Sequence, residues 1–337
     1  MTHDAGYGVG IIGVGHSLPA RVETNEELCA VLAGDTTPEW IVEKTGITQR
    51  RLAEDGDTAS GLSVAAARDA IAMAGIEPEQ VGLVIACTFS GDYLFPPVSA
   101  KVQHELGALN AQIFDVQANC SGFVTGLTVA SDRMLVDAEV EYAVVVGVEL
   151  HTRFIDRADV NTSIYFSDGA GAAVLGRVPD GRGIRSSAFF TDSSNYEAVR
   201  FRKGGSTYAN ANGSMPAEAN WIEQNGLATW KQAVTHLPAT VKRAVAKAGA
   251  ELDDVDLFLF HQANLNLIQY LVRKLRQPLE RTHTNVERIG NTGAASVAIV
   301  LSEAVERGLL RDGDTLVLGA VGAGFNFGAS VWTWGAA

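Results

Sequence analysis

The sequence predicts an α/β fold with largely buried sheets, and two patterns indicate this class. Short apolar runs rich in β-branched residues alternate along the chain with longer segments of helical periodicity. The short runs are almost continuously apolar, which is typical of strands that are covered on both faces. The chain has 337 residues, 47% of them hydrophobic. This length suggests about two domains' worth of core.

The elements follow from these patterns in chain order. Strands are expected over residues 81–88, 142–148, 170–175, 255–260, 315–320 and 329–334. Helices are expected over residues 25–33, 61–74, 95–106, 121–136, 239–248, 264–275 and 295–307. Thr235 and Pro238 indicate that one helix ends there and another begins, because proline fits only the first turn of a helix.

The order of the elements repeats once. In the first half a strand is followed by Cys120, which opens a helix rich in small residues, and then by strand 142–148. In the second half strand 255–260 is followed by Asn291, a small-residue helix and strand 315–320. We interpret this as a duplication into two pseudo-equivalent halves, although chance alternation of strands and helices is the alternative.

The halves are expected at residues 1–185 and 186–337. A loop over residues 203–222, rich in Gly, Asn, Ala and Ser, is expected between the two cores. It is interpreted as an exposed linker, with a lid or a partner-contact loop as the alternative.

Composition excludes several classes of function. The net charge is −13 and no Lys/Arg-rich run offsets it, so nucleic-acid binding is not expected. No apolar run is long enough for a membrane span, and a signal peptide is not evident. Three cysteines argue against a disulfide framework and for a reducing, cytoplasmic environment, and their spacing does not suit zinc.

Cys120 is the candidate nucleophile. It follows the apolar run 113–116 and begins a helix in the segment Ala-Asn-Cys-Ser-Gly-Phe, residues 118–123. A helix N-terminus favours negative charge and is expected to lower the pKa of the thiol. The alternative, a small buried residue, suits Cys29 and Cys87.

His261 and Asn291 are the candidate partners of Cys120. His261 directly follows strand 255–260, and side chains at the carboxyl ends of strands line the crevice of open α/β sheets. A structural histidine is the alternative, as it is for the other histidines. Asn291 is either a helix cap or an amide donor directed into a site. The repeat favours the donor, because Asn291 then corresponds to Cys120 in the other half.

These residues resemble the Cys–His–Asn set of β-ketoacyl-ACP synthase III, a family of the thiolase superfamily. The motifs are Ala-x-Cys-Ser-Gly-Phe around Cys120, His-Gln-Ala-Asn at 261–264 and Gly-Asn-Thr-Gly-Ala-Ala-Ser at 290–296. The similarity extends over residues 39–47, 167–175 and 322–325. It implies a thiolase-like fold of two duplicated βαβαβαββ halves, five layers in an αβαβα arrangement, and a homodimer.

The resemblance also implies a mechanism. Cys120 would accept an acyl group from a thioester, and a malonyl thioester such as malonyl-ACP would then undergo decarboxylative Claisen condensation, with no metal or redox cofactor. The backbone N–H groups of Cys120 and Ala323 would form the oxyanion hole, with Ala323 standing where the family usually has Gly. His261 and Asn291 would donate hydrogen bonds to the malonyl carbonyl and stabilise the enolate.

Substrate contacts are implied at the positions Trp40, Lys44, Phe95, Asn264 and Phe325. Lys44 and Val160 replace two arginines that contact acyl-CoA in the family, which leaves acyl-CoA and acyl-ACP both open as donors. Arg153 or Arg157 is expected to compensate. Phe95 matches a residue that reaches across the dimer to bound the acyl pocket.

Docking of the acyl carrier protein is implied at Lys231, Arg273 and Lys274, with Asn266 replacing a further arginine; the alternative is an ordinary solvated face. These departures suggest a relative from polyketide or specialised fatty-acid biosynthesis.

Three other kinds of protein are alternatives to a decarboxylating condensing enzyme. An acyltransferase acting on an alcohol or amine is the main alternative, but some such relatives have Asp at the position of Asn291, where it helps His act as a base. A non-catalytic partner subunit is disfavoured by the intact Cys120. Hydroxymethylglutaryl-CoA synthase-like and hydrocarbon-forming enzymes need a glutamate base, and the sequence indicates no glutamate near Cys120 or Phe95.

Overall fold

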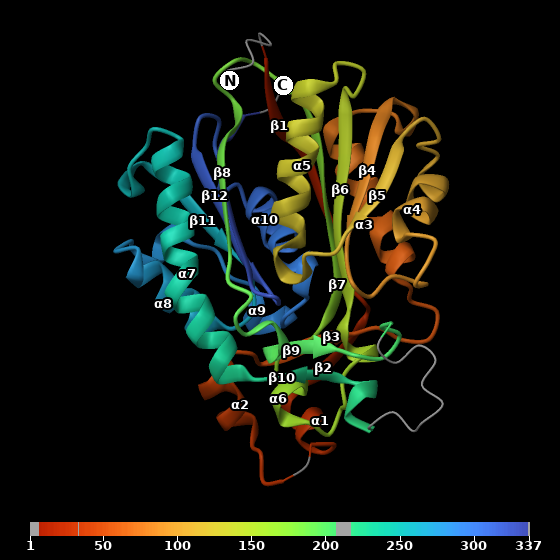
Figure 1. Cartoon of the computed structure of the whole chain (residues 1–337), viewed down its shortest axis with the longest axis vertical. Coiled ribbons are helices and arrows are strands. Elements are labelled where there is room, and N and C mark those ends of the chain that lie inside the picture. The colour runs from red at the N-terminus through yellow and green to blue at the C-terminus, as the bar shows by residue number, and fades with distance from the viewer. Residues whose placement is uncertain (1–6, 33, 207–216, 336–337) are drawn as a thin grey trace.

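The computed structural model describes residues 7–32, 34–206 and 217–335, and it confirms the α/β class (Figure 1). The strands are β1 Gly8–Ser17, β2 Arg21–Thr24, β3 Gln49–Leu52, β4 Val81–Cys87, β5 Gln112–Val116, β6 Tyr142–Leu150, β7 Asp168–Val178, β8 Gly183–Thr191, β9 Val199–Phe201, β10 Ile222–Gln224, β11 Leu257–Phe260, β12 Thr315–Gly322 and β13 Asn326–Thr333. The helices are α1 Asn25–Cys29, α2 Pro38–Thr45, α3 Ala59–Ala74, α4 Val98–Leu106, α5 Gly122–Val136, α6 Val160–Ser163, α7 Gly226–Lys247, α8 Leu265–Lys274, α9 Val286–Ile289 and α10 Ser296–Glu306.

The two halves have the same topology. The first sheet has the order β1-β7-β6-β4-β5 and the second has the order β8-β13-β12-β11. Strand β11 pairs in parallel with β12, as β4 does with β6, and Thr282 forms a single parallel bridge to Phe258 where the first half has β5. Each half therefore follows the βαβαβαββ order, and the fifth strand of the second half is reduced to one bridge.

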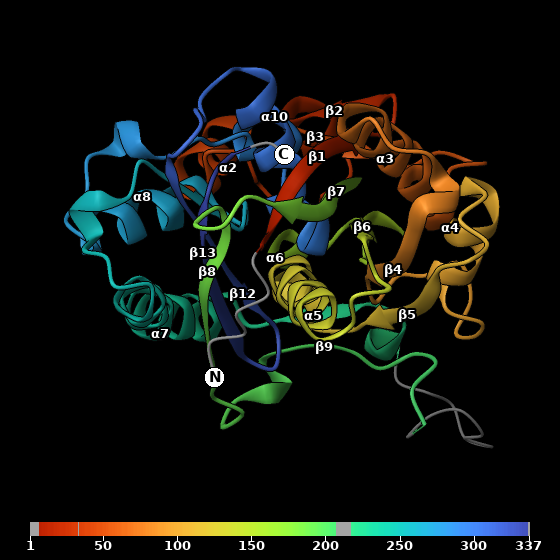
Figure 2. The same cartoon turned by 90° about the horizontal axis from the view of Figure 1, so that it is seen from above.

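The helices and sheets form five layers. Helices α5 and α10 lie between the two sheets, α3 and α4 cover the outer face of the first sheet, and α7 and α8 cover the second (Figure 2). Small residues allow α5 to lie close to both neighbours. A Cβ at Gly126 would stand 2.7 Å from the Cys87 sulfur of β4. The layered thiolase-like architecture is thereby confirmed.

This topology brings three segments that follow strands to the same end of the two sheets. Cys120 follows β5, His261 follows β11, and Ala323 lies in the hairpin after β12. Asn291 precedes α10 in the second half as Cys120 precedes α5 in the first. The carboxyl ends of the parallel strands therefore supply most of the residues that face the crevice.

The predicted break at Thr235 and Pro238 is wrong, because α7 is one continuous helix with Pro238 inside it. A proline within a helix removes one backbone hydrogen bond. Here that loss is offset by burial of Leu237, Pro238 and Val241 against the second sheet.

Further predictions differ from the structure in their boundaries, and the helix predicted over residues 25–33 ends at Cys29. Helix 95–106 begins only at Val98, where the Asp115 carboxylate accepts hydrogen bonds from the N–H groups of Val98 (2.8 Å) and Ser99 (3.0 Å). Part of the predicted 203–222 loop, residues 207–216, lies outside the described residues, and its end contains a short 3-10 helix, Ala217–Asn220. The division at residues 185 and 186 falls within β8 and stays a prediction.

Gly147 tests the close packing between β6 and the turn that precedes α10. A Cβ at Gly147 would lie 2.4 Å from the Ala294 carbonyl oxygen. We therefore expect Gly147→Ala to lower the free energy of unfolding by about 1–3 kcal/mol, measured by urea denaturation. Gly226→Ala is the matched control, because no atom lies within 4 Å of the added Cβ. Equal stability of the two variants would contradict the packing argument.

Candidate active site

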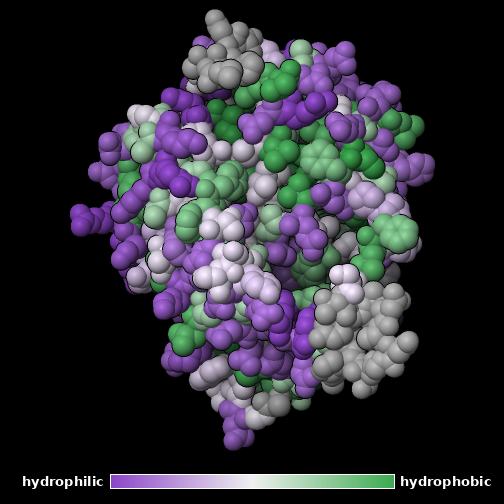
Figure 3. All heavy atoms as spheres, in the orientation of Figure 1, coloured by the Kyte–Doolittle hydropathy of each residue, from purple (hydrophilic) through white to green (hydrophobic). Residues whose placement is uncertain are grey.

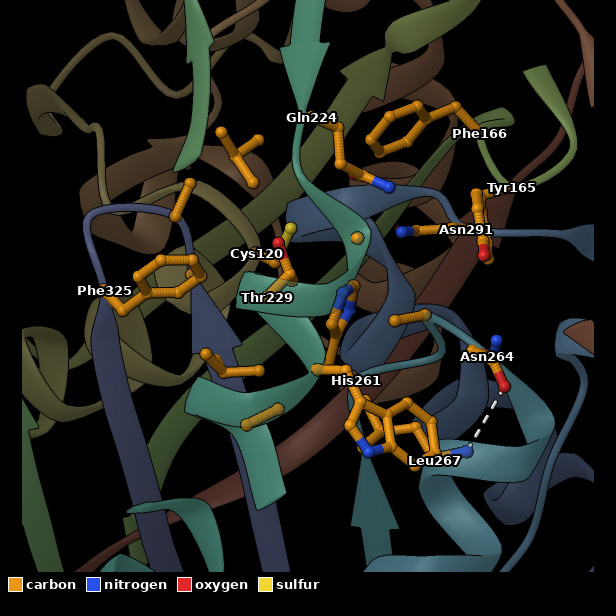
Figure 4. A pocket seen from close by; sticks show the side chains of 18 residues that line it. Cys120, Tyr165, Phe166, Gln224, Thr229, His261, Asn264, Leu267, Asn291 and Phe325 are labelled. Atoms are coloured by element: carbon orange, nitrogen blue, oxygen red, sulfur yellow. Dashed lines mark hydrogen bonds between the residues drawn. The ribbon is translucent and has the colours of Figure 1, made fainter. Parts of the chain in front are cut away.

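The functional residues of both halves line one pocket of about 110 Å³. The first half contributes Cys120, Tyr165 and Phe166. The second half contributes Val199, Gln224, Gly226, Thr229, Trp230, Ala233, His261, Ala263, Asn264, Leu267, Asn291, Val321, Gly322, Ala323 and Phe325. Figure 4 shows Cys120, His261 and Asn291 directed toward a common space. The structure thus brings together the three residues that the sequence singled out.

Cys120 lies in a 3-10 turn, Asn119–Ser121, directly before α5. Burial raises the pKa of its thiol to about 12, and the nearby Glu149 carboxylate adds to this rise, while only a backbone hydrogen bond acts in the opposite direction. The expectation of a lowered pKa is therefore wrong. Desolvation of the thiolate outweighs the stabilising effect of the helix N-terminus.

His261 is held by a serine from α10. Its Nδ1 lies 2.6 Å from Ser296 Oγ, and the N–H of Gln262 donates to the same oxygen at 3.3 Å. When the Ser296 hydroxyl donates to Nδ1, the ring proton of the neutral imidazole is on Nε2. Burial lowers the pKa of His261 to about 3, and His151 contributes further, so the ring is neutral at neutral pH.

Asn291 combines the two roles that the sequence left open. Its side-chain oxygen accepts a hydrogen bond from the N–H of Gly293 at 2.9 Å, as a cap does. Its backbone is fixed against the first half by bonds to Tyr165 and Ser167, each of 2.9 Å. The amide nitrogen points toward the centre of the pocket (Figure 4). The cap bond therefore orients the amide so that its N–H groups face the site.

Ala323 and Phe325 lie in the β12–β13 hairpin. The register pairs Gly322 with Asn326, which leaves three residues in the loop. Phe325 exchanges two 3.0 Å backbone hydrogen bonds with Asp192 and is buried against the pocket wall. The loop therefore has fixed ends, and Ala323 faces the pocket between them.

Two buried groups near the site were not found from the sequence. Glu149, on β6, lies close enough to Cys120 to raise its pKa, so the expectation of no glutamate near Cys120 is wrong. Its carboxylate accepts hydrogen bonds from Thr88, Phe89 and Ser90, and burial raises its pKa to about 8. His151 stacks on Phe166 with 4.5 Å between ring centroids. Glu149 and His151 come close to the pocket only through strand pairing in the folded sheet. No sequence motif identifies them.

Of the other predicted substrate residues, Asn264 lines the pocket, and Trp40, Lys44 and Phe95 do not. Asn264 lines the pocket, caps α8 and donates to the Lys44 carbonyl at 3.0 Å. Trp40 and Lys44 lie on α2, outside the pocket lining, and the Lys44 ammonium pairs with Glu43 at 3.2 Å. Phe95 also lies outside the lining and is 85% exposed in the single chain.

The two arginines expected to compensate at the acyl-CoA end have other partners. Arg153 donates to the carbonyl groups of Glu54 (2.9 Å) and Asp57 (2.7 Å), and Arg157 pairs with Glu23. The Asn266 amide, where an arginine was implied, donates to the carbonyl groups of Glu43 and Lys44. It therefore ties the C-terminus of α2 to α8.

The predicted docking residues are exposed on adjacent helices. Lys231 lies on α7, and Arg273 and Lys274 end α8. Close to these three cations, the ring of Trp230 on α7 contacts the ring of Tyr270 on α8. In the part of the chain that the structure describes, none of the three cations has an ion-pair partner.

The residues that the structure describes contain no cluster of three or more His, Cys, Asp or Glu side chains arranged to hold a metal ion. They also contain no helix with both the length and the apolar character needed to cross a membrane.

The sequence matches a family described as 3-oxoacyl-[acyl-carrier-protein (ACP)] synthase III over residues 114–193, and its C-terminal part over residues 245–334. It is 38% identical to the β-ketoacyl-[acyl-carrier-protein] synthase III of Syntrophomonas wolfei over 327 residues, which cover 97% of this chain and 98% of the relative. It is 39% identical to that of Paramagnetospirillum magneticum, with 95% and 97% covered.

Solved structures agree with the sequence comparisons. The β-ketoacyl-[acyl carrier protein] synthase III of Thermus thermophilus has a TM-score of 0.90 at 36% identity, covering 97% of this chain and all of that one. The priming β-ketosynthase of the R1128 polyketide biosynthetic pathway has a TM-score of 0.90 at 32% identity, covering 97% and 96%.

The raised pKa of Cys120 predicts how its alkylation depends on pH. Only the thiolate reacts, so with a pKa of about 12 the rate should rise about tenfold per pH unit from pH 7 to 10 without a plateau. The rate of iodoacetamide modification of the Cys120 peptide, followed by mass spectrometry, tests this. Cys120→Ser identifies background labelling at the other cysteines. A plateau below pH 9 would show that the helix N-terminus dominates over burial.

Proposed function

Because the chain belongs to the β-ketoacyl-ACP synthase III family, we propose that this acyltransferase condenses a Cys120-bound acyl group with malonyl-ACP to give a β-ketoacyl product. The observation that carries the proposal is the convergence of Cys120, His261 and Asn291 in one buried pocket. The names of the relatives give the reaction class, and the geometry supplies a role for each residue.

In the first step the Cys120 sulfur attacks the carbonyl carbon of an acyl thioester. The N–H groups of Cys120 and Ala323 stabilise the oxyanion of the tetrahedral intermediate. When the intermediate collapses, the bond to the leaving sulfur breaks, and the proton from the Cys120 thiol ends on the departing thiol. Because both thiols are neutral before and after transfer, the raised pKa of Cys120 does not oppose the overall step.

In the second step malonyl-ACP loses carbon dioxide, and the electron pair of the broken bond forms an enolate. His261 Nε2–H and the Asn291 amide donate hydrogen bonds to the enolate oxygen. The enolate carbon attacks the acyl carbonyl, and the Cys120 sulfur leaves as a thiolate that takes up one proton. The high pKa of Cys120 favours that final protonation.

Condensation fits the site better than acyl transfer to an alcohol or amine. A general base needs a pKa near the working pH, and the pKa of His261 is about 3. We assign the Ser296 hydroxyl as the donor to Nδ1, which leaves the ring proton on Nε2 as a donor to the substrate. A neutral donor, rather than a base, is therefore presented to the substrate, and Asn291 supplies a second neutral donor.

We also propose that the acyl carrier protein docks over Lys231, Arg273 and Lys274. The chain carries a net charge of −13, so an acidic partner would be repelled by most of its surface. These exposed cations lie on adjacent helices, α7 and α8, beside the pocket-lining residue Trp230. They provide a local basic face for the carrier protein that delivers the malonyl group, and acyl-CoA or acyl-ACP would serve as the acyl donor.

A homodimer is proposed through the β5 edge of the first sheet. β5 is an edge strand, and the neighbouring Leu94 and Phe95 are each 85% exposed. Figure 3 shows apolar side chains gathered on the side of the molecule where β4 and β5 lie in Figure 1. A second copy would cover this edge and bring Phe95 against its pocket.

The proposed reaction predicts different effects for two substitutions. Cys120→Ala should abolish acyl-enzyme formation, which mass spectrometry detects after incubation with short acyl-CoA and acyl-ACP thioesters. Asn291→Asp should keep acylation but lower carbon dioxide release from malonyl-ACP by about 100-fold, because a carboxylate repels the developing enolate. Carbon dioxide and the β-ketoacyl product are measured with labelled malonyl-ACP.

A different result would contradict each part of the proposed reaction. Turnover by Cys120→Ala would exclude the covalent mechanism. Equal loss of acylation and condensation in Asn291→Asp would show that Asn291 acts only as a structural cap. An acylated wild-type protein that releases no carbon dioxide would favour acyl transfer to an alcohol or amine.

The dimer proposal predicts that Leu94→Glu shifts the protein toward monomer, because a charge would be buried in the interface. Light scattering after size-exclusion chromatography gives the mass. Leu227→Glu is the matched control, since Leu227 is a similarly exposed leucine (81%) on α7. A monomeric wild-type protein at micromolar concentration would contradict the proposal.

A further inference from the structure

Two loops from opposite halves are joined by side-chain hydrogen bonds at the pocket. The Asn119 amide nitrogen donates to the Ala323 carbonyl oxygen at 3.1 Å. The Asn326 amide nitrogen donates to Ser121 Oγ at 3.1 Å. We call these two bonds the loop clasp. They connect the turn that contains Cys120 with the hairpin that contains Ala323.

The backbones at the clasp are in direct contact. A Cβ at Gly322 would lie 2.3 Å from the Ala118 carbonyl oxygen, so a side chain at 322 would separate the loops. Ser121 Oγ also donates to that carbonyl at 2.8 Å. The Ser121 hydroxyl and the side-chain amides of Asn119 and Asn326 therefore have their partners within the clasp.

Asn119 has a conformation that suits this role. Its φ is 49°, in the left-handed region, which asparagine tolerates better than most residues. It directly precedes Cys120, so the turn fixes the direction of the Cys120 N–H. Its side chain also fixes the Ala323 carbonyl, while the pairing of Gly322 with Asn326 fixes the start of the hairpin. Together these contacts set the direction of the Ala323 N–H.

We propose that Asn119 is a positioning residue that holds the Cys120 and Ala323 N–H groups at the separation needed to bind one oxyanion. This inference rests on the proposed function, in which those two groups form the oxyanion hole. The φ of Ala323 is not positive, so an alanine here keeps the N–H without needing the backbone freedom of glycine. Both chemical steps pass through a tetrahedral oxyanion, so both depend on Asn119.

Asn119→Gly separates the hydrogen bond from the backbone conformation, because glycine keeps a positive φ but lacks the amide. We expect single-turnover acylation and the condensation rate at saturating malonyl-ACP each to fall by about 10–100-fold. The KM for malonyl-ACP should not change. Alkylation of Cys120 by iodoacetamide, which needs no oxyanion hole, should keep its wild-type rate. Asn119→Asp preserves the shape of the side chain but removes the hydrogen-bond donor. The acylation and condensation rates should therefore fall in this variant as well.

Asn110→Gly is the matched control, since the exposed Asn110 amide also donates to a backbone carbonyl, that of Glu79 at 3.4 Å, away from the pocket. Wild-type rates in Asn119→Gly would overturn the inference and show that the left-handed turn alone suffices. A parallel fall in the alkylation rate would also overturn it, because the turn around Cys120 would then have lost its structure.

Hydrogen exchange tests the clasp independently of activity. Amides of the 322–326 hairpin should exchange faster in Asn119→Gly than in the wild type or Asn110→Gly, and unchanged exchange would overturn the inference. If the wild-type protein formed no acyl-enzyme, the proposed function would fail, while the exchange result would still decide whether the clasp holds the hairpin.

Discussion

The close approach of two helix starts between the sheets is the constraint on which the site depends. Gly122, at the start of α5, lets this helix pack tightly on β4, since an added Cβ would lie 3.1 Å from the Cys87 Cβ and in ordinary contact, at 3.6 Å, with the Cβ of Ala294 from the other half. Gly147 lets the same turn rest on β6, with the Ala294 carbonyl 2.4 Å from an added Cβ. Larger side chains at these positions would separate Cys120 from Asn291, and one pocket would become two half-sites.

The same burial determines the electrostatics of the pocket. Desolvation raises the pKa of Cys120 to about 12 and lowers that of His261 to about 3, so the thiol and the imidazole are both neutral at rest. Charge then arises only as the reaction proceeds, on a thioester oxygen or on an enolate. Fixed neutral donors act strongly on such charge because little water competes with them. If the thiol and the imidazole were charged at rest, their charges would stabilise charged groups of the bound substrate rather than the charge that develops during the reaction.

The departures from the family pattern have structural explanations of different kinds. Asn266, in place of a docking arginine, joins α2 to α8 through two carbonyl groups. The Lys44 ammonium forms an exposed ion pair with Glu43 at 3.2 Å. Ala323, in place of glycine, is accompanied by the Asn119 hydrogen bond to its carbonyl. The first two lie where α2 meets α8, outside the pocket lining, and the third joins the two loops of the proposed oxyanion hole.

The sequence by itself determined the fold class, the repeated order of the main strands and helices, and the three candidate catalytic residues. Apolar runs identify buried strands because a parallel sheet covered on both faces excludes polar side chains, and Cys120, His261 and Asn291 stand at strand or helix ends that local patterns mark. Tertiary structure alone decided what surrounds them. Glu149 reaches the neighbourhood of Cys120, and Asn119 reaches Ala323, through contacts between segments far apart in the chain. Pro238 stays within α7 because burial against the second sheet offsets a local preference. The sequence predicted a lowered pKa for Cys120 because it reveals the helix start. The structure gives a raised pKa because desolvation depends on the assembled pocket.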